Sequence, residues 1–414
     1  MLKQKYKNWI SSIMIIQFVG LIFLGMLNYK NSLGSHDINI YYQYSLNLLE
    51  GKIPYRDFNV EYPPLALLSF VLPRILTLGM SNNYHVYVCI FLLINIILVS
   101  INSLVILQII KAYHSQRKQI LVLISYTLCS FILVPVILWR YDLFPTLLTV
   151  LALLCVISTR PKLAGFCLGL GIAAKLYPVV MLPIFAAYYL AHKSYQAILN
   201  LCFGTVSAII LSFLPFLIIK NSSLFSFLSY HKERGLQIES LPAGLITLAH
   251  KFGLIEIKTV GNYGSRNIVS PLDDSVLHAL PWLFIIMYSI ILLNSLYRFR
   301  KESYQSELVK ISSLVAYTVL SLLVFIITSK VFSPQYLIWI LPFAVLLKPH
   351  QILLTLYICV TTYIMMSVGN FRELDYTKIL FLNARNALVL GLSIWVFIEY
   401  LPSSFNRVFK RDKF

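Results

Sequence analysis

Residues 84–110 read YHVYVCIFLLINIILVSINSLVILQII and contain no Asp, Glu, Lys or Arg. A helix over this stretch would be about 40 Å long, which exceeds the roughly 30 Å hydrocarbon core of a bilayer. The whole chain has the same character, with 58% hydrophobic and 12% charged residues and a mean hydropathy of +0.77. A soluble domain carries about 25% charged residues, so this chain has too little polar surface to face water on all sides.

Eleven further apolar segments accompany this one, and together they predict an all-α integral membrane protein. We expect a polytopic helical bundle of about twelve transmembrane helices, with amphipathic helices at the outer surface, forming one membrane domain over residues 1–414. Segment 9–28, the first along the chain, is long enough to span the membrane, and no small-residue cleavage site follows it. We therefore interpret it as an uncleaved helix. The other expected spans are 9–28, 119–138, 143–158, 163–174, 178–191, 197–219, 281–297, 308–328, 335–347, 351–369 and 379–400.

The distribution of charge predicts the topology. The net charge is +18, and the basic residues lie in small clusters between apolar segments, which is typical of cytoplasmic loops rather than of a nucleic-acid-binding surface. If segment 63–80 dips into the membrane without crossing it, the cytoplasmic side carries +14 and the outer side +4. A complete crossing, which Arg74 also disfavours, would place most basic loops outside. Both termini are then cytoplasmic, and the long loops 29–83 and 220–280 face outward.

The first outer loop contains a helical pattern that ends at Gly51 and Pro54. Its polar residues recur every three or four positions, and tyrosine and aliphatic residues occupy the rest, as in a helix lying at the membrane interface. Asp37 stands at its start and could be either an N-cap or a general base at the membrane surface. The polar face comprises Asn39, Gln43, Asn47 and Glu50.

Four basic residues, Arg140, Lys175, Arg234 and Lys330, lie near the expected outer ends of helices. Together they could bind an anionic headgroup, because a cation about 4 Å from a phosphate gains roughly 4 kcal/mol at an effective dielectric of 20. Taken singly, each is explained more simply as an interface anchor, and Arg140 could pair with Asp142. Lys175 stands out because it precedes Tyr177 at a break between two apolar segments, where a cavity could form.

No metal-binding or nucleotide-binding motif is present, so we expect neither a metal nor a cofactor. The cysteines lie singly in apolar segments without the spacing of a zinc site, and we expect them to be packing residues. They are Cys89, Cys129, Cys155, Cys167, Cys202 and Cys359.

Several strings, taken in order, resemble the polyprenol-phosphate-sugar-dependent glycosyltransferases of the C fold, with family 87, the mannosyltransferase-like set, most similar. The first is Asp37 followed by GKIPYRDF and EYPPL; the later ones are RYDLFPTLLTVLAL, AGFCLGLGIAAKLYP, HKERGLQIES and FSPQYLIWILP. They extend from residue 37 to about residue 342, and the last two expected helices contain no recognised motif.

The resemblance implies an inverting transfer of a hexose, with mannose expected, from a polyprenyl-phosphate carrier to a hydroxyl of a glycolipid or glycan. The reaction would occur at the outer face of the cell membrane. Asp37 matches the base, with Glu61 as the alternative. Lys175 and Arg234 match the cations that stabilise the leaving phosphate, ahead of Arg140 and Lys330. Residues of the same strings complete the candidate substrate site: Asp142, Tyr177, His231 and Gln335.

A transporter or flippase of lipid-linked substrates is the alternative function. It should contain inverted repeats and charges near mid-membrane, whereas no repeat is visible and the basic residues noted above lie near helix ends. A non-catalytic membrane scaffold would leave the ordered strings unexplained.

The topology can be tested by labelling single cysteines in intact cells with an impermeant maleimide. We expect a cysteine at position 260 to react from outside and a cysteine at position 115 to react only after permeabilisation. The reverse pattern would contradict the charge-based topology.

Overall fold

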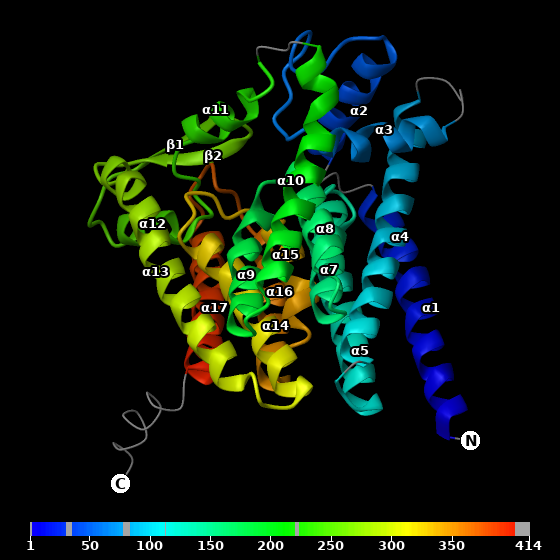
Figure 1. Cartoon of the computed structure of the whole chain (residues 1–414). Coiled ribbons are helices and arrows are strands. Elements are labelled where there is room, and N and C mark those ends of the chain that lie inside the picture. Colours follow the sequence, from blue (N-terminus) through cyan, green and yellow to red (C-terminus); the bar gives the residue numbers. More distant parts are fainter. Residues whose placement is uncertain (1, 30–34, 78–82, 112, 220–222, 402–414) are drawn as a thin grey trace. The chain divides into compact units, whose positions relative to one another are not determined.

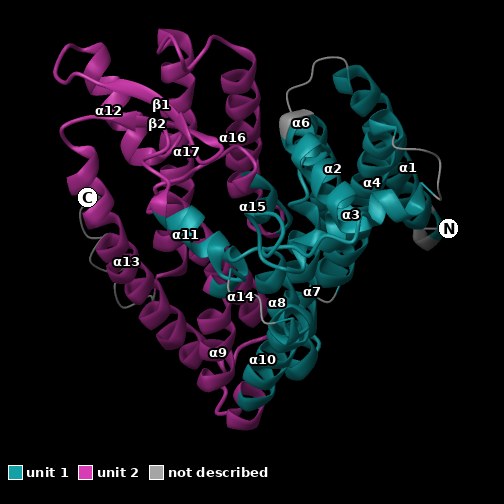
Figure 2. Cartoon of the chain, turned by 90° about the horizontal axis from the view of Figure 1, so that it is seen from above, with its two compact units in different colours: residues 1–179, 199–232, 337–342 teal, residues 180–198, 233–336, 343–414 magenta. Residues whose placement is uncertain are grey.

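The computed structural model describes residues 2–29, 35–77, 83–111, 113–219 and 223–401. The chain divides into two compact units, which are described separately (Figure 2). Unit 1 contains residues 1–179, 199–232 and 337–342, and unit 2 contains residues 180–198, 233–336 and 343–414. Every candidate site residue before Arg234 belongs to unit 1.

Unit 1 is built from helices that follow the apolar segments of the N-terminal half (Figure 1). The helix α10 begins in unit 2 and continues in unit 1, and α15 contributes its central residues. The helices are α1 (Leu2–Tyr29), α2 (Ser35–Leu49), α3 (Ala66–Leu76), α4 (Tyr84–Lys111), α5 (Gln116–Ile132), α6 (Val134–Ile137), α7 (Leu143–Ile157), α8 (Pro161–Ala174), α10 (Tyr195–Ile218), α11 (Ser226–Glu233) and α15 (Tyr336–Ala344).

Helices α1 and α4 run antiparallel, as an up-and-down membrane path requires. The Tyr29 hydroxyl at the end of α1 lies 2.6 Å from the His85 Nδ1 at the start of α4. Midway along both helices, the Ser103 hydroxyl donates to the Gln17 side chain at 2.7 Å. This contact satisfies the Ser103 hydroxyl and the Gln17 Oε1 atom, which would otherwise be costly in a hydrocarbon environment, whereas the buried Gln17 Nε2 atom has no partner among the described residues.

The amphipathic helix expected in the first outer loop is α2. Its tyrosines are buried while Asn39 and Gln43 are exposed, and the chain turns at Gly51 with a φ of +79°. The suggested N-cap role of Asp37 is wrong, because Asp37 lies in the first turn inside the helix. The apolar segment after it forms α3, whose eleven residues extend only about 16 Å, roughly half the hydrocarbon thickness.

Unit 2 combines long helices with a small region that contains one short helix and a two-stranded hairpin. Its elements are η1, a 3₁₀ helix shared with unit 1 (Tyr177–Met181), α9 (Leu182–Ala191), α12 (Leu241–Lys251), β1 (Lys258–Asn262), β2 (Ser265–Val269), α13 (Asp273–Glu302), α14 (Glu307–Ile327), α16 (Pro349–Ser367) and α17 (Tyr376–Tyr400). The antiparallel hairpin β1–β2 was not predicted from the sequence. Tyr263 and Gly264, both at positive φ, form its two-residue turn, whose backbone matches the twist of paired strands.

All twelve expected spans coincide with helices, although α5 and α6 divide segment 119–138 and α13 begins eight residues before residue 281. Seven helices of the described residues are long and apolar enough to cross a membrane: Tyr6–Tyr29, Tyr84–Lys111, Tyr195–Ile218, Asp273–Glu302, Glu307–Ile327, Pro349–Ser367 and Tyr376–Tyr400. The protein is therefore a multi-pass membrane protein. Whether the shorter helices also cross stays a prediction.

Candidate active site

Asp37 and Arg140 form an ion pair in unit 1. The Asp37 Oδ2 and Arg140 Nη1 atoms lie 2.5 Å apart, and about a quarter of each side chain is exposed. Asp37 comes from the first turn of α2 and Arg140 from the turn between α6 and α7. The pair joins the outer-loop helix to the turn that carries the RYDLFP string.

A second ion pair lies two residues further along the chain. The Lys175 Nζ donates to the Asp142 Oδ1 at 2.6 Å, and the Trp339 indole N–H donates to the same oxygen at 2.6 Å. The Asp142 side chain is only 1% exposed and that of Lys175 14%. The other carboxylate oxygen of Asp142 is buried and has no hydrogen-bond partner among the described residues. Asp142 thus links α7, the break after α8, and α15.

Aromatic rings enclose the Lys175 ammonium. It lies 4.7 Å from the centre of the Tyr141 ring and 5.3 Å from the Trp339 ring, distances at which a cation is attracted to the face of a ring. The Tyr177 ring stacks on Trp339 with centroids 4.1 Å apart. The break between α8 and α9, expected from the sequence, therefore brings Lys175 and Tyr177 to one buried cluster.

Backbone contacts fix the turns that carry these side chains. The Asn95 side-chain amide donates to the carbonyls of Leu138 and Arg140, at 2.8 and 3.2 Å. The Leu65 N–H donates to the Ala173 carbonyl at 2.9 Å. Carbonyls left without helical partners at helix ends are thereby satisfied, and the EYPPL string is held against the end of α8.

The negative charges of Glu61 and Asp37 both influence the hydroxyl group of Tyr62. Burial raises the pKa of Tyr62 well above its ordinary value, and the negative charges of Asp37 and Glu61 raise it further. Asp57, by contrast, accepts from the Ile53 N–H at 2.7 Å and pairs with Arg56, so it stabilises a turn. In that turn, Tyr55 has a positive φ of 65° and donates its hydroxyl to the Tyr62 carbonyl at 2.7 Å.

The suggested pairing of Arg140 with Asp142 is replaced by two separate pairs, Arg140 with Asp37 and Lys175 with Asp142. Together these four groups carry no net charge. Only the first pair combines a base and a cation that are both partly exposed. The sequence predicts that the Lys175 ammonium contacts the phosphate of the donor. In the structure this ammonium is paired with the buried Asp142 carboxylate, so a phosphate would have to share it with Asp142.

Arg234 and Lys330 lie together in unit 2. The Lys330 Nζ donates to the Arg234 carbonyl at 2.5 Å, and the Arg234 guanidinium donates to the Tyr263 carbonyl in the hairpin turn, at 2.6 and 3.0 Å. Burial lowers the pKa of Lys330, and the charge of Arg234 lowers it further. Gln335 belongs to unit 2 and directly precedes the first residue of α15. His231 belongs to unit 1 and lies on α11.

Sequence reasoning overlooked Arg385 in α17. This arginine is fully buried; its Nη2 donates to the Glu239 carbonyl at 2.6 Å, and its guanidinium carbon lies 3.8 Å from the Phe332 ring centre. It thereby connects α17 to the loops that carry the ERGLQIES and FSPQYLIW strings. The signal was available, because a charged residue inside a membrane helix is costly and rarely without a role.

The six cysteines are free, and Cys89 and Cys202 are exposed rather than packed. Among the described residues, no group of three or more His, Cys, Asp or Glu side chains is placed to hold a metal ion.

The buried Lys175–Asp142 pair predicts non-additive stability. Lys175→Met leaves a buried carboxylate without its cation and should destabilise the protein by about 3–5 kcal/mol. Asp142→Asn in the same chain removes that charge and retains an acceptor for Trp339, so the double variant should be more stable than Lys175→Met alone. Thermal unfolding of the four proteins in detergent measures this, and additive losses would contradict a coupled pair.

Comparison with known proteins places the chain in a family. A model of glycosyltransferase family 87 matches residues 60–325, more than half of the chain. The match includes Glu61, Arg140, Asp142, Lys175 and Arg234, but begins after Asp37 and ends before Lys330. No curated protein and no solved structure matches the chain. The chain belongs to glycosyltransferase family 87 and is a multi-pass membrane glycosyltransferase.

Proposed function

We propose that this enzyme transfers a hexose from a polyprenyl-phosphate carrier to a hydroxyl of a glycolipid or glycan, with inversion, at the outer face of the membrane. The observation that carries the proposal is the Asp37–Arg140 pair, a partly exposed carboxylate and cation 2.5 Å apart in a membrane glycosyltransferase. Mannose remains the expected sugar through the resemblance described above.

The reaction needs a base for the acceptor hydroxyl and a cation beside the leaving phosphate. The Asp37 carboxylate accepts the proton of the acceptor hydroxyl while the hydroxyl oxygen attacks the anomeric carbon. The bond from that carbon to the phosphate oxygen breaks, and its electron pair leaves with the lipid phosphate. A fixed cation beside the phosphate stabilises the transition state more than the ground state, because negative charge accumulates there as the bond breaks.

The exposed fractions favour Arg140 over Lys175 as the cation nearest the phosphate in unit 1. Arg140 is 22% exposed and its partner Asp37 is 26% exposed, whereas Lys175 is bound to a carboxylate that is 1% exposed. Lys175 then holds Asp142 and the break after α8 in place. Arg234 and Lys330 in unit 2 remain proposed phosphate ligands through the resemblance.

An apolar groove supports a lipid-linked donor. A cavity of about 420 Å³ between α1 and α4 is lined by Ile22, Met26, Tyr29, Cys89 and Leu93, among others. Tyr29 at its end lies with its ring centre 6.0 Å from that of Trp139, the residue before Arg140. A hydrocarbon chain in this groove would therefore end beside the proposed phosphate cation.

The assignment of the base predicts the effect of two matched variants. Asp37→Asn preserves shape but removes the proton acceptor, so turnover should fall by ~10²–10⁴-fold while the protein still inserts and folds. The measurement is transfer from a defined polyprenyl-phosphate sugar by purified enzyme in proteoliposomes. Glu50→Gln, at an exposed carboxylate just after the same helix, is the control and should keep its activity.

Glu61→Gln decides between the two candidate bases. Persistent activity in Asp37→Asn together with loss in Glu61→Gln would assign the base to Glu61. If wild-type enzyme transfers sugar from nucleotide sugars but not from polyprenyl-phosphate sugars, the proposed donor is wrong.

The groove predicts protection of one thiol. In a variant that retains only Cys89, undecaprenyl phosphate should slow the reaction of Cys89 with N-ethylmaleimide several-fold, because the hydrocarbon chain of the lipid covers this thiol. A variant whose only cysteine replaces Leu293, which is exposed on α13, provides the matched control and should react at an unchanged rate. If the lipid slowed the reaction of both thiols equally, or did not slow that of Cys89, its hydrocarbon chain would bind elsewhere.

A further inference from the structure

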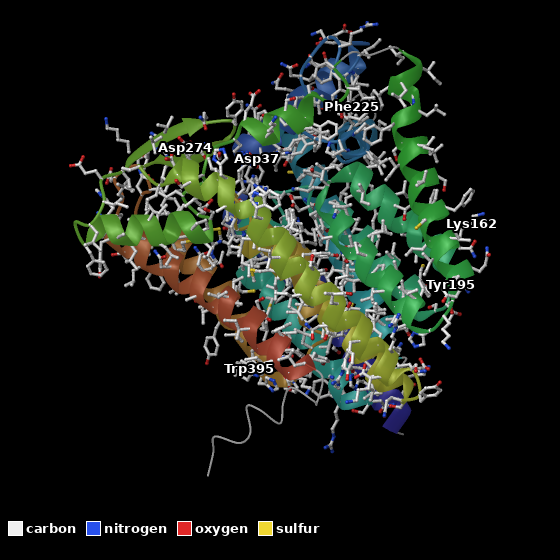
Figure 3. All side chains as sticks on the ribbon, turned by 60° about the vertical axis from the view of Figure 1, so that its left-hand side comes forward. Asp37, Lys162, Tyr195, Phe225, Asp274 and Trp395 are labelled. Atoms are coloured by element: carbon white, nitrogen blue, oxygen red, sulfur yellow. The ribbon has the colours of Figure 1, made fainter. Side chains whose placement is uncertain are left out.

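A second groove lies in unit 1, where α8 begins and α10 passes beside it. It has a volume of about 430 Å³ and is lined by residues that include Arg160, Lys162, Leu163, Phe166 and Ser207. Lys162 lies near Tyr195 at the start of α10, whereas Asp37 lies farther away, on the side of the opposite end of that helix (Figure 3). This groove is therefore separate from the Asp37–Arg140 pair.

Glycine creates the space. The backbones of α8 and α10 approach so closely that a methyl group added at Gly204 would lie 2.1 Å from the Lys162 carbonyl oxygen. One added at Gly165 would lie 2.0 Å from the Leu201 carbonyl oxygen. Gly204 lines the groove without a side chain to fill it, and the helix contact beneath involves the Lys162 backbone rather than its side chain.

Among the residues that the structure describes, the basic side chains of this groove have no acidic partner. The sequence contains no Asp or Glu between Asp142 and Glu233, and no ion pair joins Arg160 or Lys162 to another residue within the described ranges. The Lys162 ammonium lies 4.9 Å from the centre of the Phe203 ring. The start of α8 adds its positive dipole end at Pro161. The two basic side chains and the positive end of the helix dipole favour a negatively charged ligand.

The wall of the groove beside these cations is apolar and is exposed on the surface of the helices. Leu199, Phe203, Val206 and Ile210 on α10 are each more than half exposed, as expected for a helix face in contact with lipid. Leu163 and Phe166 extend the apolar surface into the groove. A ligand that fits both parts has an anionic head and a hydrocarbon chain.

We propose that this groove binds one anionic phospholipid, with its phosphate between Arg160 and Lys162 and one acyl chain along Leu163, Phe166 and α10. The site is independent of the glycosyl transfer proposed above. It lies on the side that the loop charges predict to be cytoplasmic, where basic pockets between helices commonly meet anionic headgroups.

Native mass spectrometry of the purified full chain, titrated with phosphatidylglycerol or phosphatidylcholine, tests the proposal. Wild-type protein should bind one phosphatidylglycerol more tightly than any phosphatidylcholine. Arg160→Gln/Lys162→Gln should lower that affinity about 30-fold, because each basic residue near an anionic lipid contributes about a factor of five. The charge-matched control Arg117→Gln/Lys118→Gln, at the start of α5, should retain the preference.

Two further measurements separate the head from the chain. Ser207→Phe places a ring in the groove without removing either cation, and should also weaken phosphatidylglycerol binding. Glycerol phosphate, which lacks acyl chains, should compete only at much higher concentration than the lipid. Unchanged binding in Arg160→Gln/Lys162→Gln, equal loss in the control pair, or competition by glycerol phosphate as strong as that of the lipid would overturn the proposal.

Discussion

Asp142 is the charge on which the arrangement of unit 1 depends. Its carboxylate is buried, and one of its oxygens receives both the Lys175 ammonium and the Trp339 indole N–H. A buried charge without partners costs several kcal/mol, so α7, the end of α8 and α15 are held where these groups can meet. Tyr41, Tyr62 and Tyr141 pack against one another beside these charges, and Asp37 of α2 reaches Arg140 on the neighbouring turn. Asp142 lies two residues after Arg140 and thereby helps to position the turn that carries the proposed catalytic pair.

The helices could be predicted from the sequence because hydrocarbon leaves the backbone few choices. Every N–H and C=O must be paired within the segment, so apolar stretches such as 84–110 become helices whatever their neighbours. The helix break before Tyr177 was also predictable, since Pro178 interrupts the pattern beside a cation. The hairpin at 258–269 was not predicted, because Thr-Val-Gly-Asn-Tyr-Gly-Ser lacks the Asn-Gly pair that usually marks such a turn.

The candidate residues could be named from the sequence, but their partners could not. Arg140 and Asp142 are two positions apart, which suggests a local pair, yet each contacts a residue more than 30 positions away. Such choices depend on how α2, α7 and α8 pack, which sequence spacing does not encode. Trp339 was overlooked because its apolar segment resembles an ordinary span. Arg385 lies within an apolar segment whose overall hydropathy predicts an ordinary span, although a charge within a membrane helix is itself a strong functional signal.

The position of Trp339 has a consequence for spectroscopy. Excitation of an indole moves electron density across its two rings, so the energy of its emission depends on nearby charges. Trp339 has a carboxylate at its N–H, an ammonium 5.3 Å from its ring and the Tyr177 ring stacked on it at 4.1 Å. Its fluorescence is therefore sensitive to the local electric field of the Lys175–Asp142 pair. A chain that retained Trp339 as its sole tryptophan would carry an intrinsic optical reporter beside its proposed active site, without any attached dye.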